Sequence, residues 1–192
     1  DTIRPLGSPR TLLWSDCGSG GFVATPDILQ AALTALSEGH LDEARQGFVN
    51  QLQMALFAWI KRHPAGERPL GGLLVMDEAQ TLAPSRGTTA STRSTLALAS
   101  QARKYGLGLV FATQSPKGLH NQIPGNATTQ FYGLLNSPVQ IGTAEEMARA
   151  KGGLVPDISR LRAGHFYVAT EGEAFHRVVA PWCLSYHASS PP

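Results

Sequence analysis

Residues 73–78 read LLVMDE, an unbroken apolar run that ends in two adjacent carboxylates, Asp77 and Glu78. A run without polar alternation is typical of a strand buried on both faces, as in a parallel sheet with helices on either side. Because burying a carboxylate is costly, the acidic pair indicates the carboxyl edge of such a sheet, where ligands bind in open α/β folds. Nucleotide hydrolases place there an Asp that holds Mg²⁺ and a Glu that activates the attacking water.

A second apolar run supports this interpretation. Residues 107–112 read LGLVFA, and Thr113 and Gln114 follow them. A neutral amide at a strand end can contact a γ-phosphate or the attacking water without adding charge. An apolar run that ends in Asp-Glu also occurs by chance, so it is the second strand, one crossover later, that favours catalysis.

The residues between the two runs complete a strand–helix–strand crossover. They comprise a polar loop at 84–92 and a helix predicted over 94–105, which Gly106 ends. A crossover of this length joins parallel strands. The sequence therefore predicts an α/β fold with a mainly parallel sheet flanked by helices.

Two longer segments resemble a known family. LLVMDEAQTLAP and SQARKYGLGLVFATQSPKGL are similar to the HerA/FtsK group of RecA-like P-loop ATPases, nearer to HerA, and the resemblance continues through IPGNATTQFYGLLNSPVQ and LRAGHFYVATEG. It covers about residues 71–181. It implies the C-terminal part of a RecA-like core, with a C-terminal β-hairpin. It also implies a homo-hexameric motor that uses ATP and Mg²⁺ to move double-stranded DNA, in some cases with a partner nuclease.

The resemblance also implies roles for the residues at the two strand ends. Asp77 is expected to hold Mg²⁺, and Glu78 to act as the base that activates water. Thr113 and Gln114 are expected to contact the nucleotide, with Gln114 reporting the loss of the γ-phosphate. These are the Walker B and sensor positions of such an ATPase.

Three basic residues have two interpretations each. Arg103, near the end of the crossover helix, is either an arginine finger or sensor for a neighbouring subunit's nucleotide or a cation that complements the helix dipole. Arg86 and Lys117 lie in loops at the strand ends and either face DNA or are solvated loop charges. Where the family often carries an Arg after its NATTQ-like segment, this chain has Leu134 and Leu135, which puts one phosphate contact in doubt.

The chain has no Gly-x-x-x-x-Gly-Lys-Ser/Thr motif to wrap the phosphates. The nearest stretch, GSGG at 18–21, is followed by Phe22 and Val23 and is better explained as a flexible turn. The chain is therefore expected to supply only the Walker B half of a site, with the phosphate-gripping half upstream, and to be inactive by itself.

The predicted organisation has three parts: a helical lead-in with one short strand at 1–70, the Walker B and sensor half at 71–187, and a disordered tail at 188–192. Thr25-Pro26-Asp27 indicates a helix start, and a further helix is predicted over 42–62. In the C-terminal part we expect a short helix or strand within 128–135, a strand at 139–141, and a capping box at 143–146 that opens a helix to about 151. A β-hairpin is predicted from residues 165–170 and 174–180.

Composition fits a globular piece, because 42% of the residues are hydrophobic and 16% are charged. A formal net charge of +2 neither demands nor excludes nucleic acid. The two cysteines, Cys17 and Cys183, form no metal-binding or redox motif, and the histidines show no ligand spacing. With no membrane-spanning run and no signal peptide in the sequence, we expect no membrane partner and a cytoplasmic location.

Two alternatives to a DNA motor stay open. One is a peptide- or protein-remodelling ATPase of the same fold, and the other is a ring-forming or interaction module that has lost catalysis. A GKS or GKT motif upstream in the intact gene favours a motor, whereas its absence favours the module.

Overall fold

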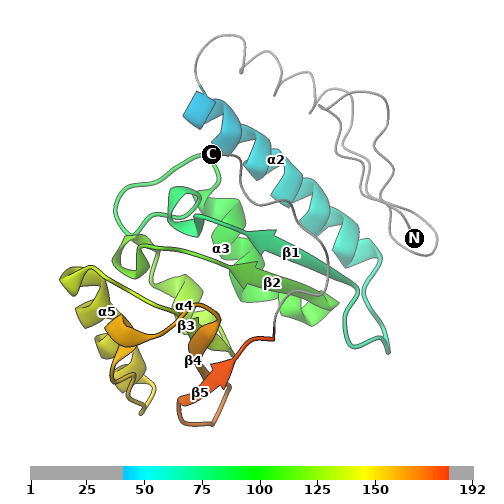
Figure 1. The fold of residues 1–192 in the computed structure, drawn as a ribbon. Coiled ribbons are helices and arrows are strands. Elements are labelled where there is room, and N and C mark those ends of the chain that lie inside the picture. The colour runs from blue at the N-terminus through cyan, green and yellow to red at the C-terminus, as the bar shows by residue number, and fades with distance from the viewer. Residues whose placement is uncertain (1–40, 182–192) are drawn as a thin grey trace. The chain divides into compact units, whose positions relative to one another are not determined.

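The computed structural model describes residues 41–181 of the chain (Figure 1). The chain divides into two compact units, with the boundary between Thr113 and Gln114. The expected glycine turn at 18–21, the helix start at residue 25, both cysteines and the tail at 188–192 lie outside the described residues. The predicted domain boundaries at residues 70 and 187 stay a prediction.

The first unit contains the predicted crossover. In chain order it has α2 (Leu41–Arg62), β1 (Gly72–Met76), the short 3₁₀ helix η1 (Ala79–Thr81), α3 (Thr92–Gln101), η2 (Ala102–Tyr105) and β2 (Leu107–Phe111). The two strands pair in parallel, with Gly72 opposite Leu107 and Met76 opposite Phe111. Figure 1 shows them side by side with their arrowheads pointing the same way. Because the strands are parallel, their carboxyl ends share one edge of the sheet.

Both helices pack on one face of this sheet. Leu56 and Ile60 of α2 form a buried cluster with Leu98 of α3 and Leu107 of β2. This confirms that the helix predicted over 42–62 uses its apolar stripe for core packing. The alternate side chains of β1 point away from these helices, and Val75 is 60% exposed.

Gly106 ends the helical part of the crossover, as its position in the sequence predicts. Its φ of 77° lies in the left-handed region, and its N–H donates to the Arg103 carbonyl oxygen over 3.0 Å. A Cβ atom at this position would lie 2.2 Å from the Cβ atom of Ala65. Glycine is therefore required both by the backbone conformation and by the close approach of Ala65.

The second unit holds an antiparallel sheet with the strand order β3-β4-β5. Its elements are η3 (Pro116–Gly118), α4 (Gln122–Asn126), β3 (Gln130–Tyr132), α5 (Pro138–Ala150), η4 (Ile158–Arg160), β4 (His165–Ala169) and β5 (His176–Val179). β4 and β5 form the predicted C-terminal hairpin, which is confirmed. The segment at 128–135, for which helix and strand were both open, supplies β3 as the third strand.

The strand predicted at 139–141 is wrong. These residues are the first turn of α5, which begins at Pro138 after an extended Ser137 (φ −80°, ψ 126°). Proline at the first helical position favours this start, and Ala144 and Ala148, one turn apart, bury the helix against the core. Thr143 is consequently inside the helix, where its hydroxyl donates to the Val139 carbonyl oxygen over 2.9 Å, and the predicted capping box is also wrong.

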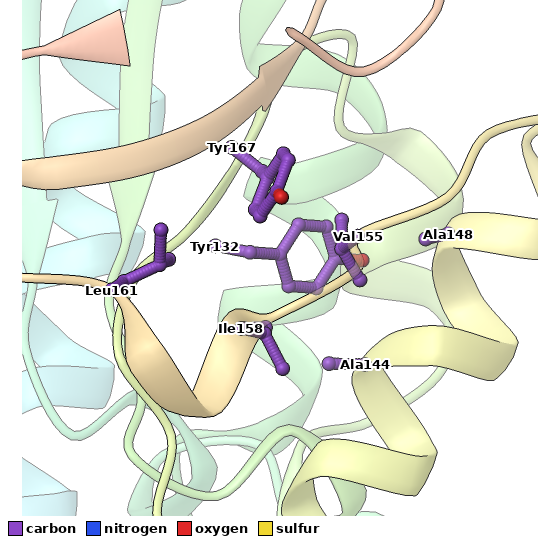
Figure 2. Close-up of a cluster of buried hydrophobic side chains, with 7 residues drawn as sticks. All are labelled: Tyr132, Ala144, Ala148, Val155, Ile158, Leu161 and Tyr167. Atoms are coloured by element: carbon purple, nitrogen blue, oxygen red, sulfur yellow. The ribbon is translucent and has the colours of Figure 1, made fainter. Parts of the chain in front are cut away.

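Tyr132 lies in the middle of the core of the second unit (Figure 2). Its hydroxyl donates to Gln130 Oε1 over 3.0 Å. Burial raises the pKa of Tyr132 from 10.0 to about 12. The buried cluster around it consists of Ala144, Ala148, Val155, Ile158, Leu161 and Tyr167. This core ties α5 and η4 to the antiparallel sheet.

Among the described residues, no helix combines the length and the apolar character that crossing a bilayer requires.

Candidate functional site

The acidic pair lies in a two-residue excursion at the carboxyl end of β1. Ala112, just after β2, donates its N–H to the Met76 carbonyl oxygen over 2.9 Å. The carbonyl oxygen of the same residue accepts the N–H of Ala79, also over 2.9 Å. Asp77 and Glu78 lie between these two bonded positions. The ladder between the strands thus continues past β1 and fixes the backbone on both sides of the carboxylates.

Glu78 has an unusual backbone conformation. Its φ of 49° and ψ of 44° lie in the left-handed region, which costs a non-glycine residue about 1–3 kcal/mol. Its N–H donates to Asp77 Oδ1 over 2.9 Å. Strained residues of this kind concentrate at functional sites, where the surrounding structure holds them.

Gln80, in η1, connects the two strand ends through its side-chain amide. The amide N–H donates to Glu78 Oε2, and the amide oxygen accepts the hydroxyl of Thr113, which follows β2. Asp77, Glu78 and Thr113, all selected from the sequence, are therefore brought to one edge of the sheet. Sequence reasoning missed Gln80, and the only signal for it was a polar residue two positions after the acidic pair.

A buried glutamine of α2, Gln53, contacts both α3 and the end of β1. Gln53 is 1% exposed, and its Oε1 accepts the hydroxyls of Ser94 over 2.6 Å and Thr95 over 3.1 Å. Its Nε2 lies 3.3 Å from the sulfur of Met76, the residue directly before Asp77. These contacts join α2, α3 and β1, so the strand end that carries the acidic pair is held from two helices.

A pocket of about 310 Å³ lies beside this edge, with Gln80 in its wall. The loop that supplies part of its lining is held by the Leu82 carbonyl oxygen, which accepts the hydroxyls of Thr89 over 2.8 Å and Ser91 over 3.0 Å. Its other lining residues are Asp42, Arg45, Gln46, Thr81, Leu82, Pro84 and Thr89.

Arg103 is not brought to the acidic pair within the first unit. It lies in η2, before the amino end of β2, whereas Thr113 follows the carboxyl end. A strand rises about 3.3 Å per residue, which puts on the order of 15–20 Å between the two ends. Arg103 therefore does not lie beside Asp77 within the first unit.

The remaining predicted residues lie on exposed segments. Arg86 is exposed in the loop between η1 and α3, and Lys117 is exposed in η3 of the second unit. Gln114 is exposed and is the first residue of the second unit. The hydroxyl oxygen of Ser115, which follows it, accepts a hydrogen bond from the side-chain amide of Gln140 in α5 over 3.1 Å.

The oxygen ligands present fit Mg²⁺ in one particular way. Asp77 is exposed, with one carboxylate oxygen engaged by the Glu78 N–H. In the part of the chain that the structure describes, no three His, Cys, Asp or Glu side chains gather into a metal-binding group. Mg²⁺ commonly binds through one or two carboxylates together with water and substrate phosphates. Asp77 suits that mode and not an all-protein cage.

Comparison with protein families gives a match over this site. The sequence model of the Zonular occludens toxin (Zot) family matches residues 41–137, just over half of the chain. The chain belongs to the Zot family. The matched range includes Asp77, Glu78, Gln80 and Thr113, together with Gln114 from the start of the second unit. The candidate site is therefore contained in the part of the Zot-family chain that defines its membership.

Solved structures of one protein, the genome packaging NTPase B204 from Sulfolobus turreted icosahedral virus 2, are similar to the Zot-family chain. Its complex with sulfate has a TM-score of 0.54 at 18% identity and covers 74% of this chain and 64% of that one. Its complex with AMP has a TM-score of 0.51 at 19% identity and covers 71% and 62%.

The Zot-family chain thus spans less than two thirds of the viral protein. At this identity the likeness shows the fold alone, and the predicted α/β fold, with a parallel sheet, flanking helices and a C-terminal hairpin, is confirmed. No curated protein matches the chain.

Proposed function

We propose that this chain supplies the hydrolytic half of an ATPase site in a DNA-translocating motor of the HerA/FtsK type. The observation that carries the proposal is the shared edge at which the Gln80 amide joins Glu78 to Thr113, while Asp77 accepts the Glu78 backbone N–H. A carboxylate that accepts a hydrogen bond from a neighbouring amide, next to an exposed second carboxylate, matches the needs of phosphoryl transfer to water. The viral neighbour, a genome packaging NTPase solved in complex with AMP, supports a nucleotide as ligand and nucleic acid as cargo.

Each residue then has one task. Mg²⁺, when bound, neutralises charge on the phosphate oxygens, and Asp77 is the residue that holds it. Glu78 accepts the proton of the attacking water, and Thr113 with Gln114 contacts the γ-phosphate region. Loss of the γ-phosphate is communicated through Gln114 to the second unit, whose backbone begins there.

The proposed site needs a phosphate-binding segment in addition to the residues of this chain. The chain has no Gly-x-x-x-x-Gly-Lys-Ser/Thr motif, so backbone amides and a lysine from elsewhere have to grip the phosphates. The 192-residue chain alone is therefore expected to bind ATP weakly and not to hydrolyse it. A homo-hexameric ring, a partner nuclease and a cytoplasmic location belong to the same proposal.

The test is ATP hydrolysis by the full-length gene product with and without duplex DNA. We expect duplex DNA to stimulate turnover and its binding to weaken steeply with salt, since phosphate contacts release counterions. Arg86→Ala and Lys117→Ala should each reduce the slope of log affinity against log salt by about 1, whereas Arg160→Ala, at an exposed site in η4, should leave it unchanged.

Other outcomes contradict the proposal in distinct ways. Stimulation by unfolded polypeptide and not by DNA would indicate a protein-remodelling ATPase. Assembly into a ring without any turnover would indicate a non-catalytic module.

A further inference from the structure

We infer that Gln80 is a positioning residue, which holds the Glu78 carboxylate and ties its orientation to the carboxyl end of β2 through Thr113. The inference rests on the proposed function, because it concerns the base of that reaction. It starts from the chain of two hydrogen bonds, Thr113 hydroxyl to Gln80 amide oxygen and Gln80 amide N–H to Glu78 Oε2.

The chemistry of the partners fixes the direction of this chain. An ionised carboxylate accepts hydrogen bonds only, so the amide of Gln80 must present its N–H to Glu78. The amide oxygen is then directed to Thr113, whose hydroxyl has to donate. A side chain with both a donor and an acceptor at this reach is needed, and glutamine provides it without adding charge. Glutamate in its place would repel Glu78, and leucine would leave both partners without this contact.

The backbone adds a reason why Glu78 needs such a partner. Its left-handed conformation places the side chain in a turn between Met76 and Ala79, both of which bond to Ala112. The main chain is fixed by these bonds, but the carboxylate lies at the end of a flexible side chain. A general base must be held within hydrogen-bond reach of the water it deprotonates. Gln80, which contributes from the next turn of the chain, supplies that restraint.

The second hydrogen bond extends the restraint to the sensor strand. Thr113 is the last residue of the first unit and is covalently bonded to Gln114. A change in the backbone conformation at the Thr113–Gln114 peptide therefore moves the Thr113 hydroxyl, which donates to the Gln80 amide oxygen. The presence or loss of the γ-phosphate at Gln114 thus changes the orientation of the Glu78 carboxylate. Gln114 and Glu78 need not touch for this to happen.

The test uses the full-length gene product and measures kcat, KM for ATP and ATP affinity. Gln80→Leu should lower kcat by about 10-fold or more with KM within about two-fold, because orientation of the base and not binding is lost. Thr113→Val should act in the same direction, and Thr113→Ser, which keeps the hydroxyl, should preserve turnover. Gln46→Leu is the matched control, since Gln46 lines the same pocket but lies outside the Gln80 hydrogen-bond chain.

The double variant of Gln80→Leu and Glu78→Gln tests whether Gln80 acts by positioning Glu78 or in another way. If Gln80 acts through Glu78, then Gln80→Leu has no further effect on the residual turnover of Glu78→Gln. Equal fractional losses in both backgrounds, or wild-type kcat in Gln80→Leu while Glu78→Gln is defective, would overturn the inference and leave the proposed function intact. Equal turnover of wild type and Glu78→Gln would instead remove the proposed function itself.

A readout independent of turnover is the NMR signal of the Gln80 side-chain amide in the ligand-free protein. We expect it to shift in Thr113→Val and in Glu78→Gln and to stay in place in Gln46→Leu. An unchanged signal in the first two variants would show that the hydrogen-bond chain is absent in solution and would overturn the inference. This measurement also decides the matter if Gln80→Leu fails to fold.

Discussion

At the scale of single residues, Glu78 combines a strained backbone with the proposed role of general base. Its left-handed conformation lies between Met76 and Ala79, which both bond to Ala112. Backbone strain of this kind concentrates at positions where a side chain serves a function. The backbone conformation at residue 78 favours glycine, whereas the proposed reaction needs a carboxylate at this position.

Two substitutions of Glu78 that both remove the carboxylate test this preference for glycine. Glu78→Gly should be more stable than Glu78→Ala by about 1 kcal/mol in free energy of unfolding, because glycine adopts the left-handed region without a steric penalty. Urea unfolding of the two variants measures the difference. Equal stability, or a more stable alanine variant, would show that residue 78 is not left-handed in solution.

The residues proposed to carry the chemistry were predicted from the sequence, whereas the residue that supports them, Gln80, was not. Asp77, Glu78, Thr113 and Gln114 stand at the ends of apolar runs, where their type and position point to one edge. The hydrogen bond that links Gln80 to the second strand end comes from Thr113, 33 positions away in the sequence. Such a contact forms only in the tertiary fold, and the local sequence around Gln80 does not predict it.

At the scale of elements, the crossover from β1 to β2 depends on a sharp end to its helical part. Gly106 provides that end, and its N–H and carbonyl groups bond to Arg103 and Gly71. The register of β2 beside β1, and with it the position of Thr113, follows from where this turn is made.

Gly106→Ala should lower the free energy of unfolding by about 1–3 kcal/mol, since an alanine at a φ of 77° is strained and its Cβ meets Ala65. Gly47→Ala, in the middle of α2 with nothing within 4 Å of its Cβ position, is the opposite case and should stabilise by about 0.5–1 kcal/mol. Thermal or urea unfolding compares the two. A neutral Gly106→Ala would mean that the turn is made differently.

Sequence reasoning succeeded for the existence of the strands, although β1, predicted to be buried on both faces, has one exposed face in the described residues. β1, β2 and the hairpin of β4 and β5 are runs with strong strand character bounded by turn residues. It failed at α5, where Val139 and Ile141 have strand propensity but belong to a helix that Pro138 starts and that Ala144 buries. Packing of that helix against the Tyr132 core outweighs the local preference.

At the scale of the whole molecule, Arg103 and the acidic pair lie at opposite ends of the strand pair. If the proposed ring exists, an arginine at that end of the strand pair is available to a neighbouring subunit. The competing interpretation, a cation at a helix end, makes no use of a second subunit.

Mixing Arg103→Ala subunits with Glu78→Gln subunits should therefore restore part of the ATPase activity, because some interfaces then combine an intact Glu78 with an intact Arg103. The measurement is turnover against mixing ratio, with co-assembly checked by size. Arg103→Lys is the control: it should be defective if forked contacts to phosphate matter and nearly silent if only charge matters. A flat, inactive mixing curve despite co-assembly would reject the role in trans.

The central claim is that the edge formed by β1 and β2 hydrolyses a nucleotide with Glu78 as the base. The most direct measurement compares ATP turnover and ATP binding in the full-length gene product and its Glu78→Gln variant, which keeps the shape of the side chain but cannot take a proton. We predict that turnover falls by about 10²-fold or more while affinity for ATP changes little. Near-normal turnover in Glu78→Gln would contradict the claim.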